Sequence, residues 1–570
     1  MRRNSRSGPA RRPAQRLTHR PARRLGPVGV VGIAAFGLLA AGCSDSLASP
    51  TAESSEAIGT SAPPTTASAP ATTEAAPATT QAAPTTEPTD TTDATDATDT
   101  TAVDTGGGEA RPDSDIAWEE LQPGIDEAMV EVPLDHDDPD GEQIEIYMIR
   151  HQADPARRIG VLFVNPGGPG YGGSILAEQA EFIYGPDLLA SFDIIGFDPR
   201  GTGLSEPSID CVDDYDPFFG IETGPDDDAE DAQLQNVAAF FAQSCVNRSG
   251  DLLPFVGTAS AATDIDAIRQ ALGEEQVSYF GWSYGTQLGA TWVSMFPDTV
   301  RAAVLDGAVD PTVGRIDGLV QQAAGFDSSL STFLADCSSD IDCAFHNDGD
   351  AEGAFADLLV QLERTDIPTA PGRPNVTQGV FELAVAQALY SDLSWPELAQ
   401  ALADASTGDG AGVLALYDSY YGRFPDGGYG DELEAYFAIT CADDPSAGGD
   451  AGLAEAIERR DDFEAASPRI GTSAAYEVLI CASFPAGSLG DGDPEVEITG
   501  DGAGPVVVVG NTGDPATPFE GSRRMADSLE EGVFVEVEAN VHTAYGLNSC
   551  IDDAIDTYLV ELVVPDGLRC

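Results

Sequence analysis

A serine, Ser283, stands between two glycines in the stretch GWSYG. The β-rich run QVSYFG ends at Gly281, and a helical pattern begins at Tyr284. A sharp turn from a strand into a helix exposes a serine hydroxyl, but it leaves room only for small residues two positions before and after the serine. Gly281 and Gly285 meet this requirement. The pattern therefore predicts that Ser283 is a nucleophile.

A serine hydroxyl needs a neighbouring base to become a good nucleophile. Four histidines lie beyond the N-terminal leader, namely His136, His151, His346 and His542. The first lies in an acidic stretch, the second precedes a predicted strand, and the third belongs to a mainly helical region. Only His542 follows a late β-rich run, VFVEVEA, in a loop where the edge of a sheet is expected. We predict that His542 is the base.

The predicted base needs an acidic partner that fixes its tautomer and stabilises the imidazolium. Asp514 lies in the Gly/Pro-containing loop NTGDPATP, after the apolar run GPVVVVG. We predict that Asp514 is the acid; Asp310, in LDGAVDP, also follows a predicted strand and is the alternative. Thr517 either hydrogen-bonds within the acid loop or serves only in a turn.

An oxyanion that forms at the serine needs backbone N–H donors. The helix that begins at Tyr284 directs its first N–H groups toward the serine. A second donor is expected from NPGGPGYGGS (165–174), which follows the predicted strand IGVLFV. Pro166 and Pro169 have no N–H, and we predict that Gly168 and Tyr284 form the pair. A phosphate-binding loop is the weaker interpretation, because the chain contains no lysine.

These residues need structural elements that bring them together. The predicted strands are IGVLFV (159–164), FDIIGF (192–197), QVSYFG (276–281), RAAVLDG (301–307), GPVVVVG (504–510) and VFVEVEA (533–539), and helical segments include 262–273, 286–296 and 520–530. This alternation predicts an α/β fold with a mostly parallel sheet and helices on both faces. We expect a core of residues 113–312 and 494–570, interrupted by a mainly helical insertion at 313–493.

Four motifs occur in an order that resembles a known family: NPGGPG, FDPRGTGLSEP, GWSYGTQLGA and GDPATP. From about residue 115 to the C-terminus, the chain is similar to the exported actinobacterial tripeptidyl aminopeptidase-like α/β-hydrolases, which are relatives of proline iminopeptidases. The resemblance implies the α/β-hydrolase fold, the triad Ser283, Asp514 and His542, and an insertion that caps the site. It implies no metal and no cofactor, and structural roles for Asp198 and Arg200.

The resemblance also implies selection of substrates with a free N-terminus. A free α-amino group calls for a carboxylate in the cap, and Asp443 and Asp444, in AITCADDP, are the candidates. The alternative for both is a solvated acidic loop beside a disulfide. We expect a serine exopeptidase that acts on peptides through an acyl-enzyme. A carboxylesterase or lipid hydrolase with the same triad, and a non-enzymatic surface binding protein, are the alternatives.

The first 112 residues differ in composition from the rest. Residues 1–42 combine nine arginines with the apolar run 28–41, as in a signal peptide. The stretch LLAAGC resembles a lipobox and predicts that Cys43 is lipidated. Residues 43–112 are rich in Thr, Ala and Pro, which is typical of a disordered tether. We expect a lipoprotein on the outer face of the cell membrane, with secretion as the alternative and the Sec and Tat routes both open.

The chain has 96 acidic and 27 basic residues, so nucleic acid is not an expected partner. Eight cysteines remain beside Cys43: Cys211, Cys245, Cys337, Cys343, Cys441, Cys481, Cys550 and Cys570. An even number in an exported chain predicts four disulfides, and sequential pairing closes the shortest loops. The cysteines lack close C-x-x-C spacing, and the calcium-loop-like stretch 348–359 ends in Leu rather than Glu, so no metal site is expected. No oligomeric state follows from the sequence.

Overall fold

The computed structural model describes residues 111–112, 114, 116–490, 492 and 496–570. The predicted signal peptide (1–42), the predicted lipidation site Cys43 and the predicted tether up to residue 110 lie outside the described residues. None of the described helices has the length and the apolar composition that spanning a membrane requires.

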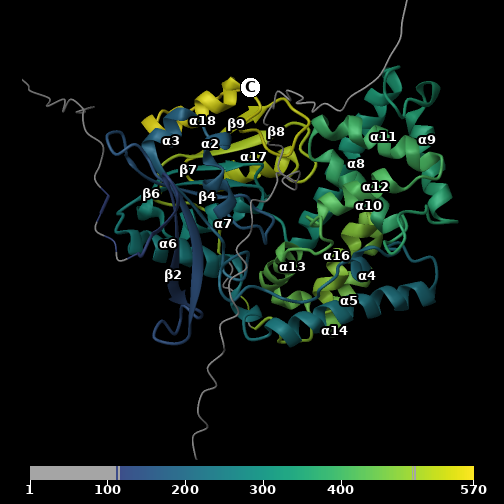
Figure 1. The fold of residues 1–570 in the computed structure, drawn as a ribbon, viewed down its shortest axis with the longest axis horizontal. Helices are drawn as coiled ribbons and strands as arrows, with labels where there is room; N and C mark the ends of the chain where they lie inside the picture. Colours follow the sequence, from purple (N-terminus) through teal and green to yellow (C-terminus); the bar gives the residue numbers. More distant parts are fainter. Residues whose placement is uncertain (1–110, 113, 115, 491, 493–495) are drawn as a thin grey trace, which may run out of the picture. The chain divides into compact units, whose positions relative to one another are not determined.

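A nine-stranded sheet forms the centre of the fold, in the order β1-β2-β3-β5-β4-β6-β7-β8-β9 (Figure 1). The strands are β1 (Glu119–Gln122), β2 (Ile125–Pro133), β3 (Gln143–His151), β4 (Gly160–Asn165), β5 (Phe192–Phe197), β6 (Val277–Trp282), β7 (Val300–Asp306), β8 (Val506–Asn511) and β9 (Gly532–Val537). The pairs from β5 through β9 are parallel, whereas β1, β2 and β3 add an antiparallel edge. The predicted mostly parallel sheet is confirmed.

Helices cover both faces of this sheet, which explains why every residue of β4, β5, β6 and β8 is buried and most of these residues are apolar. One face packs against α6 (Thr258–Leu272), α7 (Tyr284–Met295) and α17 (Phe519–Ser528). The other face packs against α1 (Ser174–Glu178), α2 (Ala180–Ile183), α3 (Pro186–Ser191) and α18 (Ser549–Glu561). The predicted arrangement of helices on two sides of the sheet is therefore present.

The described residues between β7 and β8 contain the helices α8 to α16 and add no strand to the sheet (Figure 1). We call these helices the cap. They are α8 (Arg315–Ser339), α9 (Ala351–Leu362), α10 (Gln378–Leu389), α11 (Trp395–Ser406), α12 (Ala411–Tyr420), α13 (Glu432–Ala442), α14 (Gly449–Glu458), α15 (Arg460–Ala466) and α16 (Thr472–Ala482).

Two helices that precede β6 in the chain pack against the cap. They are α4 (Asp216–Phe219) and α5 (Asp228–Ser249), which Figure 1 shows beside α14 and α16. The ring of Phe219 stacks on Phe437 of α13 at 5.7 Å between centroids, and Phe241 of α5 meets the same ring at 5.5 Å. The expected boundary at residue 313 therefore leaves out two helices whose aromatic side chains are buried against the cap.

Four disulfides pair the eight cysteines in sequential order, as predicted from the shorter loops that this pairing closes. They are Cys211–Cys245, Cys337–Cys343, Cys441–Cys481 and Cys550–Cys570. The third joins α13 to α16 within the cap, and the fourth ties the C-terminal residue to α18.

Candidate active site

Ser283 lies in the turn between β6 and α7, in a conformation that side chains rarely adopt. Its φ and ψ are 55° and −127°, outside the regions that non-glycine residues normally occupy. A Cβ at Gly281 would overlap the carbonyl oxygen of Gly285, and a Cβ at Gly285 would lie 2.6 Å from the carbonyl oxygen of Asn165. The structure thus gives a steric reason for both glycines around the serine.

His542 lies in the loop after β9 and is hydrogen-bonded to Asp514, which follows β8. The Nδ1 atom of His542 lies 2.9 Å from Oδ1 and 3.1 Å from Oδ2 of Asp514. Both side chains are buried. The sequence-based choice of these two residues therefore corresponds to a direct contact between them.

The Asp514 carboxylate is held in one orientation by its own loop. Its Oδ1 accepts the N–H groups of Ala516 and Thr517, each at 2.9 Å, and its Oδ2 accepts the Thr517 hydroxyl at 2.8 Å. Thr517 thus hydrogen-bonds within the acid loop. The alternative acid, Asp310, instead binds Arg524 and Thr312.

Hydrogen bonds also hold the main-chain N–H and carbonyl groups of His542. The N–H of His542 donates to the carbonyl oxygen of Tyr390 at 2.9 Å, and the side-chain amide of Asn511 donates to the carbonyl oxygen of His542 at 3.1 Å. The Nε2 atom is buried and has no hydrogen-bond partner among the described residues. Ser283 and His542 line the same pocket without a hydrogen bond between Oγ and Nε2 within the described structure. Such a contact often forms only when substrate binds.

The two predicted oxyanion donors are Gly168, in the loop after β4, and Tyr284, the first residue of α7. The N–H of Gly167 is taken by the side chain of Asn165 at 3.0 Å. The N–H of Gly168 has no hydrogen-bond partner among the described residues, and Gly168 lines the pocket with a φ of 105°. A Cβ at Gly167 would lie 2.9 Å from the nitrogen of Tyr284, so the glycine loop packs directly against the start of α7. This arrangement favours Gly168 over Gly167 as the donor from the loop.

The pocket beside Ser283 is a cavity of about 140 Å³ between the sheet and the cap. Aromatic side chains are prominent in its wall: Tyr171, Phe219, Tyr390, Tyr420, Tyr421, Tyr436, Phe437 and Tyr476. Its remaining lining includes Thr223, Gln387, Ser473 and two carboxylates, Glu432 of α13 and Glu477 of α16. A substrate in this cavity therefore meets aromatic rings and polar side chains, with two acidic groups among them.

Both pocket carboxylates are partly buried, and this burial raises their pKa values. Burial raises the pKa of Glu477 to about 7, although the hydrogen bond from Tyr436 and the positive charge of Arg315 oppose this shift. The Tyr436 hydroxyl donates to Glu477 at 2.8 Å. Burial also raises the pKa of Glu432. Sequence reasoning missed both residues, because nothing local distinguishes them among 96 acidic residues.

The structure does not bring Asp443 and Asp444 to the pocket, and the amine-binding role expected for them does not fit their positions. The Asp443 carboxylate accepts the N–H of Thr258 at 2.7 Å and its hydroxyl at 2.6 Å, at the start of α6. The Thr258 hydroxyl also contacts the hydroxyl of Tyr284 at 2.7 Å. Asp444 lies 3.4 Å from Nε of Arg315. Asp443 thus joins the cap to the core, whereas Asp444 pairs with an arginine of the cap helix α8.

Asp198 and Arg200 have the structural surroundings that the family resemblance implies. Asp198 accepts the N–H groups of Ser174 at 3.1 Å and Leu204 at 2.9 Å. Arg200 is fully buried and pairs with Asp264 at 2.7 Å. Within the described residues, no group of three or more His, Cys, Asp or Glu side chains is arranged to hold a metal ion.

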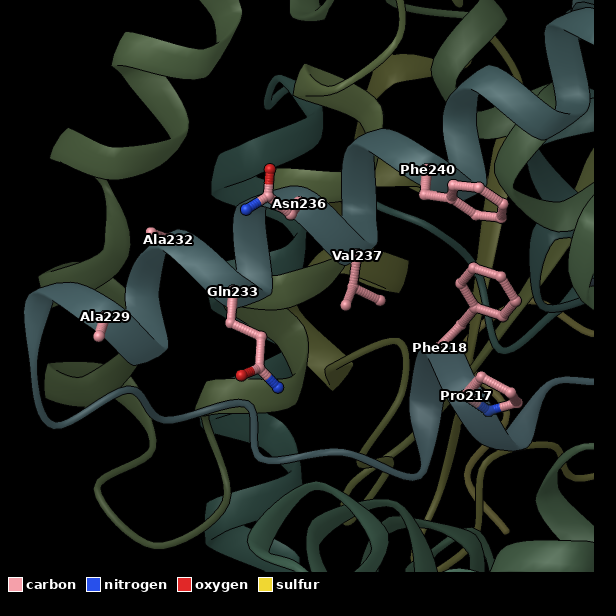
Figure 2. Close-up of a pocket in the computed structure, with 8 residues that line it drawn as sticks. All are labelled: Pro217, Phe218, Ala229, Ala232, Gln233, Asn236, Val237 and Phe240. Carbon is pink, nitrogen blue, oxygen red and sulfur yellow. The ribbon is translucent and has the colours of Figure 1, made fainter.

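A second hollow, of about 530 Å³, lies on α4 and α5 (Figure 2). Pro217, Phe218, Val237 and Phe240 line it together with Ala229, Ala232, Gln233 and Asn236. These residues include no nucleophile and no titratable group. The chemistry of this protein is therefore expected in the pocket of Ser283.

Comparison with known proteins gives one family and several relatives. The family described as alpha/beta hydrolase fold matches residues 160–545. The chain is 33% identical over 462 residues to the serine protease Hip1 of Mycobacterium tuberculosis, covering 77% of this chain and 86% of that protein. It is 34% identical over 460 residues to carboxylesterase B of the same species, covering 78% and 86%. It is 30% identical over 470 residues to a tripeptidyl aminopeptidase of Streptomyces coelicolor, covering 78% and 84%.

Proposed function

Because the chain belongs to the α/β-hydrolase fold family and is a serine hydrolase, we propose that it is an exported, lipid-anchored exopeptidase. It removes short peptides or single residues from substrates with a free N-terminus. The observation that carries this proposal is the pocket in which two partly buried carboxylates, Glu432 and Glu477, accompany Ser283.

In the proposed reaction, Ser283 Oγ attacks the carbonyl carbon of the scissile peptide bond. Nε2 of His542 accepts the hydroxyl proton and then gives it to the leaving amine, which departs and leaves an acyl-enzyme. Asp514 holds Nδ1 of His542, so that Nε2 is the basic nitrogen and the imidazolium is stabilised. The N–H groups of Gly168 and Tyr284 stabilise the oxyanion. Water, activated by His542, then hydrolyses the acyl-enzyme.

The two pocket carboxylates support a substrate with a free amino group. Partial burial of a carboxylate is costly, and a substrate ammonium group offsets this cost when it binds. The aromatic walls exclude water from the same cavity and strengthen the attraction between the ammonium group and the carboxylates. A peptide that extends further in the N-terminal direction has an uncharged peptide group, and no ammonium group, beside these carboxylates.

The substitution Glu477→Gln tests this proposal with paired substrates. For chromogenic peptides with a free N-terminus we expect KM to rise roughly tenfold to a hundredfold, because the variant loses one charge-assisted hydrogen bond to the substrate. For the N-acetylated peptide and for a short ester, KM should change little. Equal effects on free and blocked substrates would exclude amine recognition by Glu477.

Glu127→Gln is a matched control for the Glu477 variant. Glu127 also accepts a tyrosine hydroxyl, that of Tyr147, at 2.8 Å, but it lies in β2 away from the pocket. We expect this variant to leave KM unchanged for both substrate types.

A second candidate is a carboxylesterase that uses the same triad. The similarity to a protein named carboxylesterase B and the aromatic side chains in the wall of the pocket favour it. Turnover of short-chain esters with a kcat/KM far above that of every free-amine peptide would support this candidate over the exopeptidase.

The proposed location rests on the N-terminal sequence and on the disulfides. Four disulfides fit a protein that folds in an oxidising compartment. Lipidation at Cys43 is tested by metabolic labelling with a fatty-acid analogue in an actinobacterial host. We expect the wild-type protein to be labelled and to sediment with membranes, and Cys43→Ala to be unlabelled. Label on the Cys43→Ala variant would exclude this site.

A further inference from the structure

Asp306 is a buried carboxylate that contacts the main chain just beyond His542. It is the last residue of β7 and is fully buried. Both of its carboxylate oxygens lie 3.0 Å from the nitrogen of Ala544, and Oδ2 accepts the N–H of Tyr545 at 2.9 Å. These donors are two and three residues after His542 in the chain. The carboxylate therefore holds the loop that carries the base.

The same residue also contacts the predicted nucleophile. The carbonyl oxygen of Asp306 accepts the N–H of Ser283 at 3.0 Å, which extends the pairing of β6 with β7 into the serine turn. Gly307 follows with a φ of 67°, and a Cβ there would lie 2.7 Å from the carbonyl oxygen of His542. Asp306 and Gly307 thus bring the backbones of Ser283 and His542 close to one another.

The charge of Asp306 is not balanced by an arginine within the described residues. Its oxygens accept only main-chain N–H groups there, whereas Asp193, another buried carboxylate of the sheet, pairs with Arg111 and Arg158. The ionisable groups that interact with Asp306 are His542 and Asp514. Burial raises the pKa of Asp306 to about 6, while the N–H groups of Tyr545 and Ala544 and the charge of His542 oppose this shift.

An unbalanced buried carboxylate costs free energy of folding, and a neutral side chain would avoid that cost. The interaction of Asp306 with His542 offers a functional gain that could offset this cost in stability. During the reaction His542 becomes an imidazolium, and a nearby anion stabilises that form.

We propose that Asp306 is a positioning residue of this hydrolase, which sets the distance between Ser283 and His542 and adds a second negative charge that favours the imidazolium. It differs from Asp514, which binds Nδ1 directly, because Asp306 acts through the main chain and through its field. The inference rests on the proposed roles of Ser283 and His542, and not on the identity of the substrate.

The test measures the rate at which a fluorophosphonate labels Ser283 in the secreted, disulfide-intact chain as a function of pH. For Asp306→Asn we expect labelling, and kcat for an ester, to fall roughly tenfold to a hundredfold, with KM changed by less than about threefold. Removing the anion disfavours the charged imidazolium, so the acidic limb of the labelling profile should move to lower pH.

Asp193→Asn is the matched control, because it also removes a buried carboxylate that accepts a main-chain N–H, that of Ala153, at 3.0 Å. We expect it to lower the melting temperature without changing the labelling profile. An Asp306→Asn protein whose labelling rate and acidic limb match those of Asp193→Asn would overturn the proposal.

Two further outcomes are distinguished. If Asp306→Asn does not fold, Asp306→Ser is measured instead, since a serine hydroxyl also accepts an N–H and adds no bulk. Failure of both variants to fold, while Asp193→Asn folds, assigns Asp306 to stability and rejects the proposal. Absence of labelling in the wild-type protein would instead reject the proposed role of Ser283.

Discussion

The main-chain N–H of His542 donates a hydrogen bond to the carbonyl oxygen of Tyr390 in the cap, at 2.9 Å. Beside it, Ser391 and Val541 form a β-bridge, and the N–H of Asp392 donates to the carbonyl oxygen of Asn540 at 3.1 Å. The Tyr390 ring also packs against the imidazole, with 5.4 Å between centroids. The cap and the loop of the base therefore share main-chain hydrogen bonds, and a displacement of one is expected to move the other.

The substitution Asp392→Pro tests this link, because it deletes a single N–H. Asp392 is the first residue of a short 3₁₀ helix, a position that accepts proline. Ser391 before it is extended, with φ −154° and ψ 137°, which is the conformation that a residue preceding proline prefers. We expect kcat/KM for a short ester to fall roughly threefold to tenfold, which corresponds to the free energy of about one hydrogen bond. Asp392→Ala keeps the N–H and should retain the wild-type value; equal rates in the two variants would contradict the link.

The assignment of the acid is tested by two aspartate variants. Asp514→Asn presents an amide to Nδ1 of His542 and disfavours the reactive tautomer, so we expect kcat to fall by roughly four orders of magnitude. Asp310→Asn removes the alternative acid, which binds Arg524 and Thr312, and should leave kcat within about threefold of wild type. A larger loss of kcat in the Asp310 variant would reverse the assignment.

Replacement of Ser283 by alanine should abolish both hydrolysis and fluorophosphonate labelling. Loss of a nucleophile of this kind costs roughly four to six orders of magnitude in kcat. The melting temperature should not fall below that of the wild type. The backbone strain at residue 283, where φ is 55°, comes from the turn and is about the same for alanine as for serine. Residual labelling at another residue would show that a different nucleophile is present.

The binding of free-amine peptides should depend on pH through Glu477. Burial raises its pKa to about 7, so in the free protein the carboxylate is charged above this pH and largely neutral below it. Binding of an ammonium group should therefore weaken as the pH falls from 7 to about 5.5. Calorimetry with the Ser283→Ala variant measures this without turnover. In the double variant that also carries Glu477→Gln, affinity should be low and should not follow this profile.

The disulfide Cys441–Cys481 should affect both stability and substrate choice. It joins α13, which carries Glu432, to α16, which carries Glu477. Replacing both cysteines by alanine should lower the free energy of unfolding by roughly 2 to 5 kcal/mol. It should also raise KM for free-amine peptides more than for esters. The same change at Cys337 and Cys343, which close a loop of sequence separation 6, should leave both KM values unchanged.

Local rules explain how much of the site could be predicted. Gly281 and Gly285 mark the turn of Ser283, because only small residues fit there. Asp514 and His542 each follow a strand, β8 and β9, and these two strands are parallel neighbours in the sheet. The mostly parallel sheet followed from strands that are apolar on both faces. These features depend on the chain within a few residues of each position, so they could be predicted from local patterns.

Long-range packing places the side chains that surround the predicted triad. It brought Glu432 and Glu477 into the pocket, directed Asp443 to Thr258, and set Asp306 behind the loop of His542. It also packed α4 and α5 against the cap across the expected boundary. Each of these outcomes depends on contacts between residues far apart in the chain. In a sequence with 96 acidic residues, no local pattern distinguishes a carboxylate that becomes buried from one that stays in water.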